Sequence, residues 1–229
     1  MAVHTQAQVL SIQRMLQALG YDPATLDGVI GPRTRAAIRA FQRDHGLRID
    51  GVAGPVTCAR LQLLVEPRWL AIARGHLGLA ERDGPASNAL LLQWATHLGL
   101  AYRDDAEPWC GLFVAHCLRA ALPTEPLPDH ALAARSWRYF GQACAPMTGA
   151  VLIFWRDQPK GWTGHVGFCI GADVDAFHLL GGNQGNRVSI VRIARQRLLG
   201  ARWPVTVPAP VDEGLSPRVA RAPLSRNEA

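Results

Sequence analysis

The sequence predicts an α+β protein of two domains, in which a small three-helix bundle precedes a domain of helices packed on an antiparallel sheet. Two observations lead to this prediction. The first 64 residues carry amphipathic helical patterns separated by a repeated turn motif. Residues 68–204 then pass from helical patterns to short apolar runs, which are rich in β-forming residues and separated by glycine.

The first predicted helix covers residues 5–19. Its apolar side chains recur at helical spacing, and Gly20 follows where a C-terminal cap is expected. The apolar positions are Val9, Ile12, Leu16 and Leu19. This pattern is typical of an amphipathic helix with one buried face.

A turn motif then occurs twice, as DGVIGPRT at residues 27–34 and as DGVAGPVT at residues 50–57. Asp-Gly permits a tight turn, and Gly-Pro places a flexible residue before a proline in the first helical turn, where the missing N–H costs nothing. Each copy therefore predicts a turn and a helix start. The two helices are expected over residues 32–45 and from the second copy to about Leu64, with a linker at 65–67.

Residues 3–64 resemble the peptidoglycan-binding module found at the ends of many cell-wall hydrolases. The resemblance rests on LGY at residues 19–21, FQ at 41–42 and the two DGxxGPxT motifs. It implies that residues 1–64 form a wall-binding module with peptidoglycan as its partner. The alternative is a bundle that serves only as a scaffold, because repeated Asp-Gly turns are structural devices first.

The second predicted domain covers residues 68–204. Its helical segments are 68–80, 89–98, 109–122 and 131–140, and its strands are 149–155, 165–171, 176–182, 189–193 and 199–204. Residues 205–229 contain four prolines and little apolar periodicity. We therefore expect them to form a disordered tail.

Composition limits the partners and the compartment. The net charge of +6 favours polyanionic partners, but the arginines are scattered and no nucleic-acid-binding motif is visible, so nucleic acid is not expected. No apolar stretch reaches the roughly 18 to 20 residues of a membrane span. The N-terminus lacks the features of a secretory signal, which predicts synthesis in the cytoplasm. Five cysteines without CxxC pairs argue against a disulfide framework and a structural zinc site.

Cys110 is the candidate nucleophile, because it stands at the start of a strongly apolar helix in EPWCGLFVAHCL. Backbone N–H groups at a helix N-terminus are unpaired and the helix dipole is positive there. We therefore expect the pKa of the Cys110 thiol to be lowered, and the same N–H groups to form an oxyanion hole. Cys117, two turns into the helix, is expected to be buried and inert.

His165 is the candidate base, because it opens the predicted strand HVGFCIG after a glycine-containing loop. A third polar group should orient its imidazole. The next strand offers His178 in AFHLL and Asn183 in GGNQ. We favour Asn183, because the preceding Gly-Gly pair allows a close backbone approach and the amide oxygen can accept the histidine N–H.

Five segments of this domain resemble the NlpC-like and CHAP families of papain-fold peptidoglycan amidases and endopeptidases. They are PWCGLFV, GAVLIFWR, GHVGFCIG, LLGGNQGN and LGARWP. The resemblance implies a papain-like cysteine amidohydrolase with Cys110 as nucleophile, His165 as general base and acid, and Asn183 as the orienting residue. NlpC-like enzymes often have a histidine near His178, which keeps the third role open. No cofactor or metal is implied, and a zinc hydrolase is disfavoured because no paired-histidine ligand spacing is visible.

Together the two resemblances imply a peptidoglycan hydrolase that cleaves an amide bond of the stem peptide, with the module concentrating the enzyme on its polymer. The alternative is a non-catalytic cell-envelope-binding protein. A chain without a signal sequence would reach the periplasm and the cell wall as a phage-type endolysin or as an antibacterial effector. An effector would have secretion machinery and an immunity protein as partners. We expect a monomer, and the sequence leaves the cleaved bond open.

Overall fold

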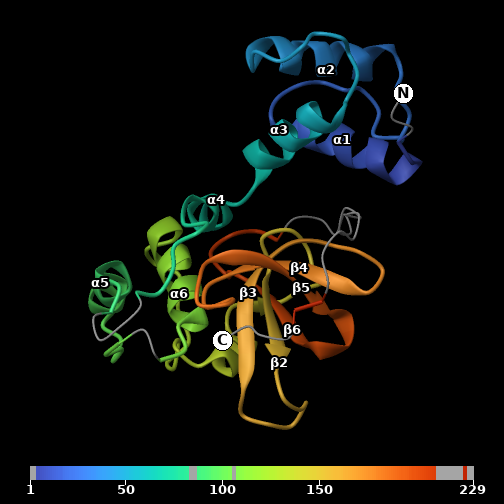
Figure 1. Cartoon of the computed structure of the whole chain (residues 1–229). Helices are drawn as coiled ribbons and strands as arrows, with labels where there is room; N and C mark the ends of the chain where they lie inside the picture. The colour runs from blue at the N-terminus through green and yellow to red at the C-terminus, as the bar shows by residue number, and fades with distance from the viewer. Residues whose placement is uncertain (1–3, 83–86, 105–106, 210–223, 226–229) are drawn as a thin grey trace. The chain divides into compact units, whose positions relative to one another are not determined.

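The computed structural model describes residues 4–82, 87–104, 107–209 and 224–225. The chain divides into two compact units, residues 1–66 and 67–229 (Figure 1), and each has its own hydrophobic core. Most of the tail that we expect to be disordered, residues 210–223 and 226–229, lies outside the described residues. Ordered chain continues past residue 204, because the backbone N–H groups of Val205 and Thr206 donate to the buried Glu125 carboxylate at 2.8 and 2.9 Å.

The N-terminal unit consists of three helices, α1 (Gln6–Ala18), α2 (Pro32–Asp44) and α3 (Pro55–Val65). A capping box starts α1, in which the Thr5 side chain accepts from the backbone of Gln8 while the Gln8 side chain accepts from the backbone of Thr5. The other two helices begin with proline directly after glycine, as the repeated motif predicts. Leu16, Ile38, Phe41 and Leu61 form the fully buried centre of the bundle.

A buried glutamine holds the second copy of the turn motif. The Gln42 side-chain nitrogen donates to the Asp50 carboxylate, to the carbonyl of Val52 and to the Thr57 hydroxyl, at 2.9, 3.0 and 3.1 Å. Its oxygen accepts the backbone N–H groups of Asp50 and Gly51 at 3.1 and 2.9 Å. Gln42 is 1% exposed. One side chain from α2 thus fixes the whole turn before α3.

Gln13 of α1 makes the equivalent contacts with the first copy. Its nitrogen donates to the Asp27 carboxylate, the Val29 carbonyl and the Thr34 hydroxyl, and its oxygen accepts the N–H of Gly28. The repeated Asp, Gly and Thr are therefore explained by the fold, because each copy satisfies the hydrogen bonds of one fully buried amide.

The C-terminal unit begins with three α-helices, α4 (Arg68–Gly75), α5 (Ala89–Leu98) and α6 (Cys110–Ala121). The prediction that the first of them continues to residue 80 is wrong. After Gly75 the chain forms a turn at residues 76–78 and then pairs with residues 186–188, where Gly78 donates to the Val188 carbonyl at 2.9 Å and Val188 donates to the Leu79 carbonyl at 2.7 Å. Long-range pairing therefore overrides the local helical pattern.

The helix predicted over residues 131–140 is a 3-10 helix, η1 (Ala134–Tyr139). Backbone N–H groups in and next to this segment donate to the carbonyl three residues earlier. Phe140 donates to Trp137 at 3.1 Å, and Ser136 donates to Ala133 at 3.0 Å. The fully buried Trp137 fixes this segment, because its indole N–H donates to the Ala131 carbonyl at 2.9 Å.

Six strands form one antiparallel sheet in the order β1-β6-β2-β3-β4-β5. They are β1 (Gln142–Ala143), β2 (Val151–Trp155), β3 (Gly164–Ala172), β4 (Ala176–Gly181), β5 (Ser189–Ala194) and β6 (Leu198–Trp203), and a short 3-10 turn, η2 (Arg195–Arg197), precedes β6. The two-residue, exposed β1 is not predicted by the sequence. Helices followed by an antiparallel sheet confirm the α+β class.

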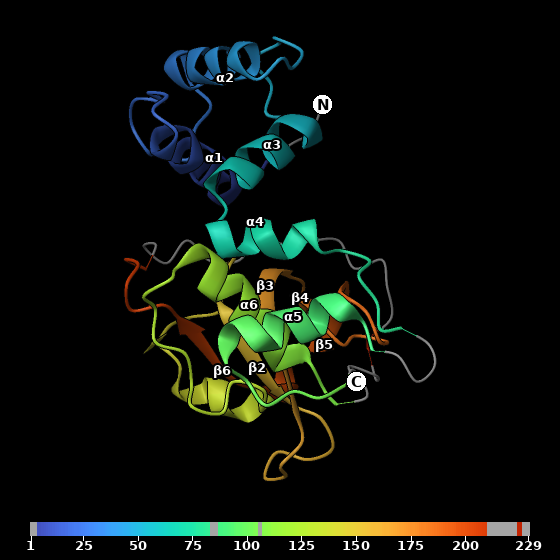
Figure 2. The same ribbon diagram turned by 90° about the vertical axis from the view of Figure 1, so that its left-hand side faces the viewer.

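The helices of this unit gather on one side of the sheet (Figure 2), where α6 packs against β3 and β4 and is flanked by α4 and α5. Nine of the twelve residues of α6 are buried, as are all residues of β4. The first turn of α6 contacts the chain just after β4. This contact brings the start of α6, which carries Cys110, to the loop that contains Asn183.

Candidate functional site

Cys110 is the first residue of α6, and its side chain is buried, with 3% of its surface exposed. The preceding Trp109 occupies the N-cap position without a side-chain cap, so the backbone N–H groups of the first helical turn are not consumed by a capping side chain. The predicted position of Cys110 at a helix N-terminus is therefore confirmed.

Trp109 fixes this helix start against the loop that follows β4. The indole is fully buried, and its N–H donates to the Glu81 carboxylate at 2.7 Å. Gly182 lies against the same ring, because a Cβ placed at Gly182 would stand 2.6 Å from a Trp109 ring carbon and 2.7 Å from the Phe113 Cβ. A side chain at Gly182 would therefore push the loop away from α6.

Burial raises the pKa of the Cys110 thiol, while the backbone N–H groups of Val166 and Gly111 and the charge of Arg156 act in the opposite direction. The predicted lowering of this pKa is therefore wrong. The helix N-terminus acts as expected, but desolvation of the thiolate outweighs it. Backbone N–H groups from both α6 and β3 nevertheless point at the sulfur, where they can stabilise a developing negative charge.

His165 is fully buried on β3, next to Val166, whose N–H faces the Cys110 sulfur. Its Nε2 lies 3.0 Å from the side-chain oxygen of Gln184. Because that oxygen can only accept, Nε2 carries the hydrogen, and in the neutral ring the basic nitrogen is then Nδ1. The backbone N–H of Val166 thus links Cys110 to β3, where the neighbouring His165 is held by Gln184, and we refer to these residues as the cluster around Cys110.

Gln184 is held in place from several sides. Its side-chain nitrogen donates to the backbone carbonyl and, at 3.3 Å, to the hydroxyl of Ser189, while its own N–H donates to the Arg187 carbonyl at 2.9 Å. Gly181 leaves the room that the pair needs, because a Cβ there would stand 2.9 Å from the Gln184 oxygen and 3.2 Å from the His165 Nε2. The amide oxygen is thereby fixed toward the imidazole.

Asn183, which we expect to orient His165, does not make this hydrogen bond in the structure. Its backbone has a left-handed φ of 56°, so the chain turns after Gly182 and the following side chain returns over His165. The residue that bonds to His165 is Gln184, which follows Asn183 in the GGNQ loop. The backbone turn that decides between the two is not visible in a strand pattern. The catalytic role of each residue stays a prediction.

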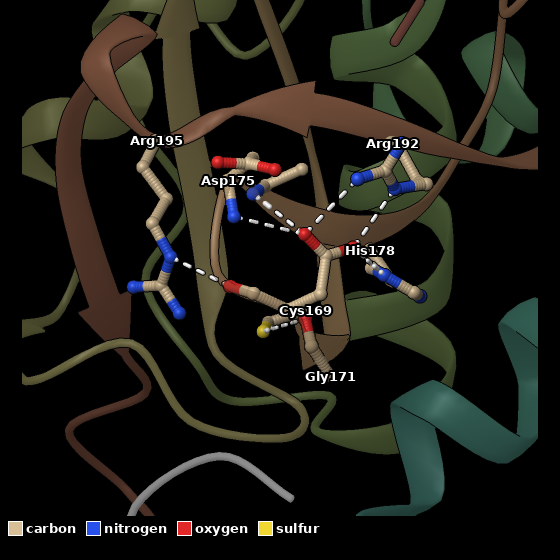
Figure 3. Close-up of polar contacts among 8 residues, drawn as sticks. Cys169, Gly171, Asp175, His178, Arg192 and Arg195 are labelled. Atoms are coloured by element: carbon tan, nitrogen blue, oxygen red, sulfur yellow. Dashed lines mark hydrogen bonds and ion pairs between the residues drawn. The ribbon is translucent and has the colours of Figure 1, made fainter. Parts of the chain in front are cut away.

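His178, the other candidate, is engaged elsewhere in the sheet. His178 and Arg192 both bond to the Asp173 carboxylate, at 2.7 Å for His178 and at 2.8 and 3.0 Å for Arg192. Figure 3 shows these two side chains pointing toward the same carboxylate. The Arg192 guanidinium, together with His178, holds the pKa of Asp173 far below its usual range. These contacts tie β4 to β5 and to the turn between β3 and β4, which is a structural role.

The other thiols and the histidines show no comparable arrangement among the described residues. None of the five cysteines, which all lie in the described part of the chain, forms a disulfide, and burial raises the pKa of Cys117 well above its ordinary value. His76 and His116 lie with their Nε2 atoms 3.2 Å apart, and Trp94 stacks on His116 at 4.0 Å.

In the described part of the chain, no three His, Cys, Asp or Glu residues are placed to hold a metal ion, and no helix is long and apolar enough to cross a membrane.

Comparison with known proteins concerns the N-terminal unit. Residues 5–61 match the family described as a putative peptidoglycan binding domain. The chain is 39% identical over 56 residues to the N-acetylmuramoyl-L-alanine amidase CwlM of Mycobacterium tuberculosis, and 43% identical over 53 residues to the spore cortex-lytic enzyme of Oceanobacillus iheyensis. It is 40% identical over 57 residues to the zinc D-Ala-D-Ala carboxypeptidase of Streptomyces albus G.

These matches cover 24%, 23% and 23% of this chain and only 14%, 19% and 22% of the three relatives. They show that the N-terminal unit is homologous to modules of cell-wall hydrolases, and they do not reach the cluster around Cys110. No solved structure matches the chain.

Proposed function

We propose that the protein is a peptidoglycan hydrolase that cleaves an amide bond of the stem peptide with Cys110 as nucleophile. The observation that supports this most strongly is the cluster at the start of α6. There a cysteine faces the N–H of Val166, and the adjacent His165 is held by Gln184. This combination of nucleophile, base and orienting group is the arrangement that acyl transfer by a thiol requires.

The chemistry follows from these positions. His165 takes the thiol proton as the Cys110 sulfur attacks the amide carbonyl, and the backbone N–H groups at the start of α6 stabilise the oxyanion. Collapse of the tetrahedral intermediate breaks the C–N bond, and His165 returns the proton to the leaving amine. Water, deprotonated by the same imidazole, then hydrolyses the thioester and restores the thiol.

We infer that the C-terminal unit belongs with the papain-like NlpC and CHAP hydrolases. In support, Cys110 begins a helix that packs on the sheet, His165 is the second residue of β3, and Gln184 follows β4. In those families the cysteine, histidine and third polar group come from the corresponding helix and strands. Gln184 takes the orienting role that the sequence interpretation gave to Asn183.

The N-terminal unit supplies attachment to the polymer. The relatives that share it are named as amidases, a cortex-lytic enzyme and a carboxypeptidase, so the same module occurs in proteins named for different wall chemistries. A tethered catalyst sees its substrate at a high effective concentration. We infer that the enzyme acts on the cell wall as an endolysin or as a secreted effector. An effector would be neutralised by an immunity protein in the producing cell.

The test is digestion of purified sacculi by the wild-type protein and by Cys110→Ala. We expect the wild type to solubilise the wall, and Cys110→Ala to sediment with it without releasing fragments. Cys117→Ala is the matched control, since Cys117 is a fully buried thiol on the same helix without a histidine partner in the proposed mechanism. A wild-type protein that binds but never releases fragments would instead favour a non-catalytic envelope-binding protein.

A further inference from the structure

Asn183 has a combination of features that its place in a turn does not explain. Its side chain is 4% exposed, its φ is 56°, and within the described structure its side-chain oxygen has no hydrogen-bond partner. A buried acceptor without a donor is costly, so such an atom in a native protein calls for a specific reason. The turn alone does not supply that reason, since glycine adopts a left-handed φ more readily.

Asn186 provides an internal comparison in the same loop. It has nearly the same backbone conformation, with φ 60°, but its side chain is exposed to solvent. Asparagine at an exposed left-handed position is ordinary turn chemistry, because its side chain finds water and the conformation is tolerated. The left-handed backbone conformation is therefore common to both asparagines. The difference is that Asn183 also buries its side-chain oxygen.

The neighbours of Asn183 place it in the candidate active site. Gly182 lies against the Trp109 ring, next to the nucleophile position, and Gln184 holds the His165 ring. Asn183 is the residue between these two contacts. A hydrogen-bond acceptor at this point is suited to a donor that arrives with the substrate. A peptide substrate carries such donors, because its backbone has N–H groups next to each amide bond that could be cleaved.

We propose that the Asn183 side-chain oxygen accepts a hydrogen bond from an amide N–H of the peptide substrate and positions the scissile carbonyl over Cys110. This inference rests on the proposed function, because it assumes that a peptide amide is the substrate. Asn183 is then a substrate-binding residue, and Gln184 is the residue that orients His165. Gly182 on one side, against the Trp109 ring, and Gln184 on the other, bonded to His165, fix the backbone at Asn183.

The test compares Asn183→Gly with Asn186→Gly in the full-length protein, using soluble muropeptides as substrate. Glycine suits both backbone conformations, so each variant should fold with a melting temperature equal to or above that of the wild type. Asn183→Gly should lower kcat/KM by about tenfold or more, since a buried hydrogen bond to the substrate is lost. Asn186→Gly should retain the wild-type kcat/KM. Asn183→Asp keeps an oxygen acceptor and should retain more activity than Asn183→Gly.

A folded Asn183→Gly protein with wild-type kcat/KM would overturn the inference, and so would an Asn183→Asp protein less active than Asn183→Gly. Failure of the proposed function gives a different result, because the wild type would then be inactive or Cys110→Ala would remain active. The melting temperature separates a role in binding from a role in the turn. A purely structural Asn183 would change stability while leaving the kcat/KM of the folded fraction unchanged.

Discussion

Replacement of Gln42 by leucine tests whether one buried amide organises the repeated turn of the N-terminal unit. The two side chains are similar in size, so the change removes hydrogen bonds without opening a large cavity. Five hydrogen bonds are lost, two of which have a buried partner, namely the N–H of Gly51 and the hydroxyl of Thr57. The remaining partners, on Asp50 and Val52, lie nearer the surface and can turn to water.

The expected loss follows from these two buried groups. A buried polar group without a partner costs about 1 to 3 kcal/mol, which gives a loss of about 2 to 6 kcal/mol for Gln42→Leu. A unit of this size has a free energy of unfolding of about 3 to 10 kcal/mol. The variant should therefore lose a large part of the stability of the N-terminal unit, and Gln13→Leu should have a similar effect on the first turn.

The distribution of tryptophan allows this to be measured in the intact chain. All seven tryptophans belong to the C-terminal unit, at positions 69, 94, 109, 137, 155, 162 and 203. In urea unfolding, tryptophan fluorescence therefore follows that unit, whereas far-UV circular dichroism follows the helices of both. Gln42→Leu should move the circular dichroism transition of the N-terminal helices to lower urea and leave the fluorescence midpoint unchanged.

Gln17→Leu is the matched control, because Gln17 is on α1 with an exposed side chain. It should change the free energy of unfolding by less than about 0.5 kcal/mol. Equal behaviour of Gln42→Leu and Gln17→Leu would refute the reasoning. The Asp-Gly turns would then be stable without the glutamine, and the buried hydrogen bonds would contribute nothing measurable.

Two further predictions concern the C-terminal unit. Gln184→Ala should lower kcat by at least about tenfold in a folded protein, because the imidazole loses its orienting partner. His178→Ala should lower the melting temperature and keep kcat. Steady-state kinetics and thermal unfolding check both, and the opposite ranking would favour His178 as the orienting residue. Burial, with the charges of His76 and His97, lowers the pKa of His116 to about 4. As the pH falls below about 6.5, His116 is therefore protonated in the unfolded chain before it is protonated in the folded protein. The contribution to the free energy of unfolding that is present above pH 6.5 declines between about pH 6.5 and pH 4. Urea unfolding followed by fluorescence at pH 7.5 and pH 5 should show a smaller decline for His116→Gln than for the wild type, and an equal decline would contradict it.

Much of the secondary structure could be predicted because it is encoded locally. The helix predicted over residues 89–98 has those bounds in the structure, and the principal strands begin and end within two residues of their predicted positions. The errors arise where distant residues decide. The α4 helix stops early because residues 78–81 pair with 186–188, and β1 exists only because it pairs with β6.

The candidate site divides in the same way. Cys110 at a helix start and His165 near the start of a strand follow from local patterns. The contact of Gln184 with His165 depends on the left-handed turn at Asn183, which a single sequence shows only as the letters GGNQ. The raised pKa of Cys110 depends on burial by the whole fold, so the helix N-terminus alone predicts the wrong direction.

The most direct test of the central claim is mass spectrometry of the fragments that the wild-type protein and Cys110→Ala release from purified sacculi. We expect fragments from the wild type in which one stem-peptide amide has been hydrolysed, and none from a folded Cys110→Ala protein that still sediments with the wall. Fragments cut only in the glycan chain, or the same hydrolysed amide with folded Cys110→Ala, would contradict it.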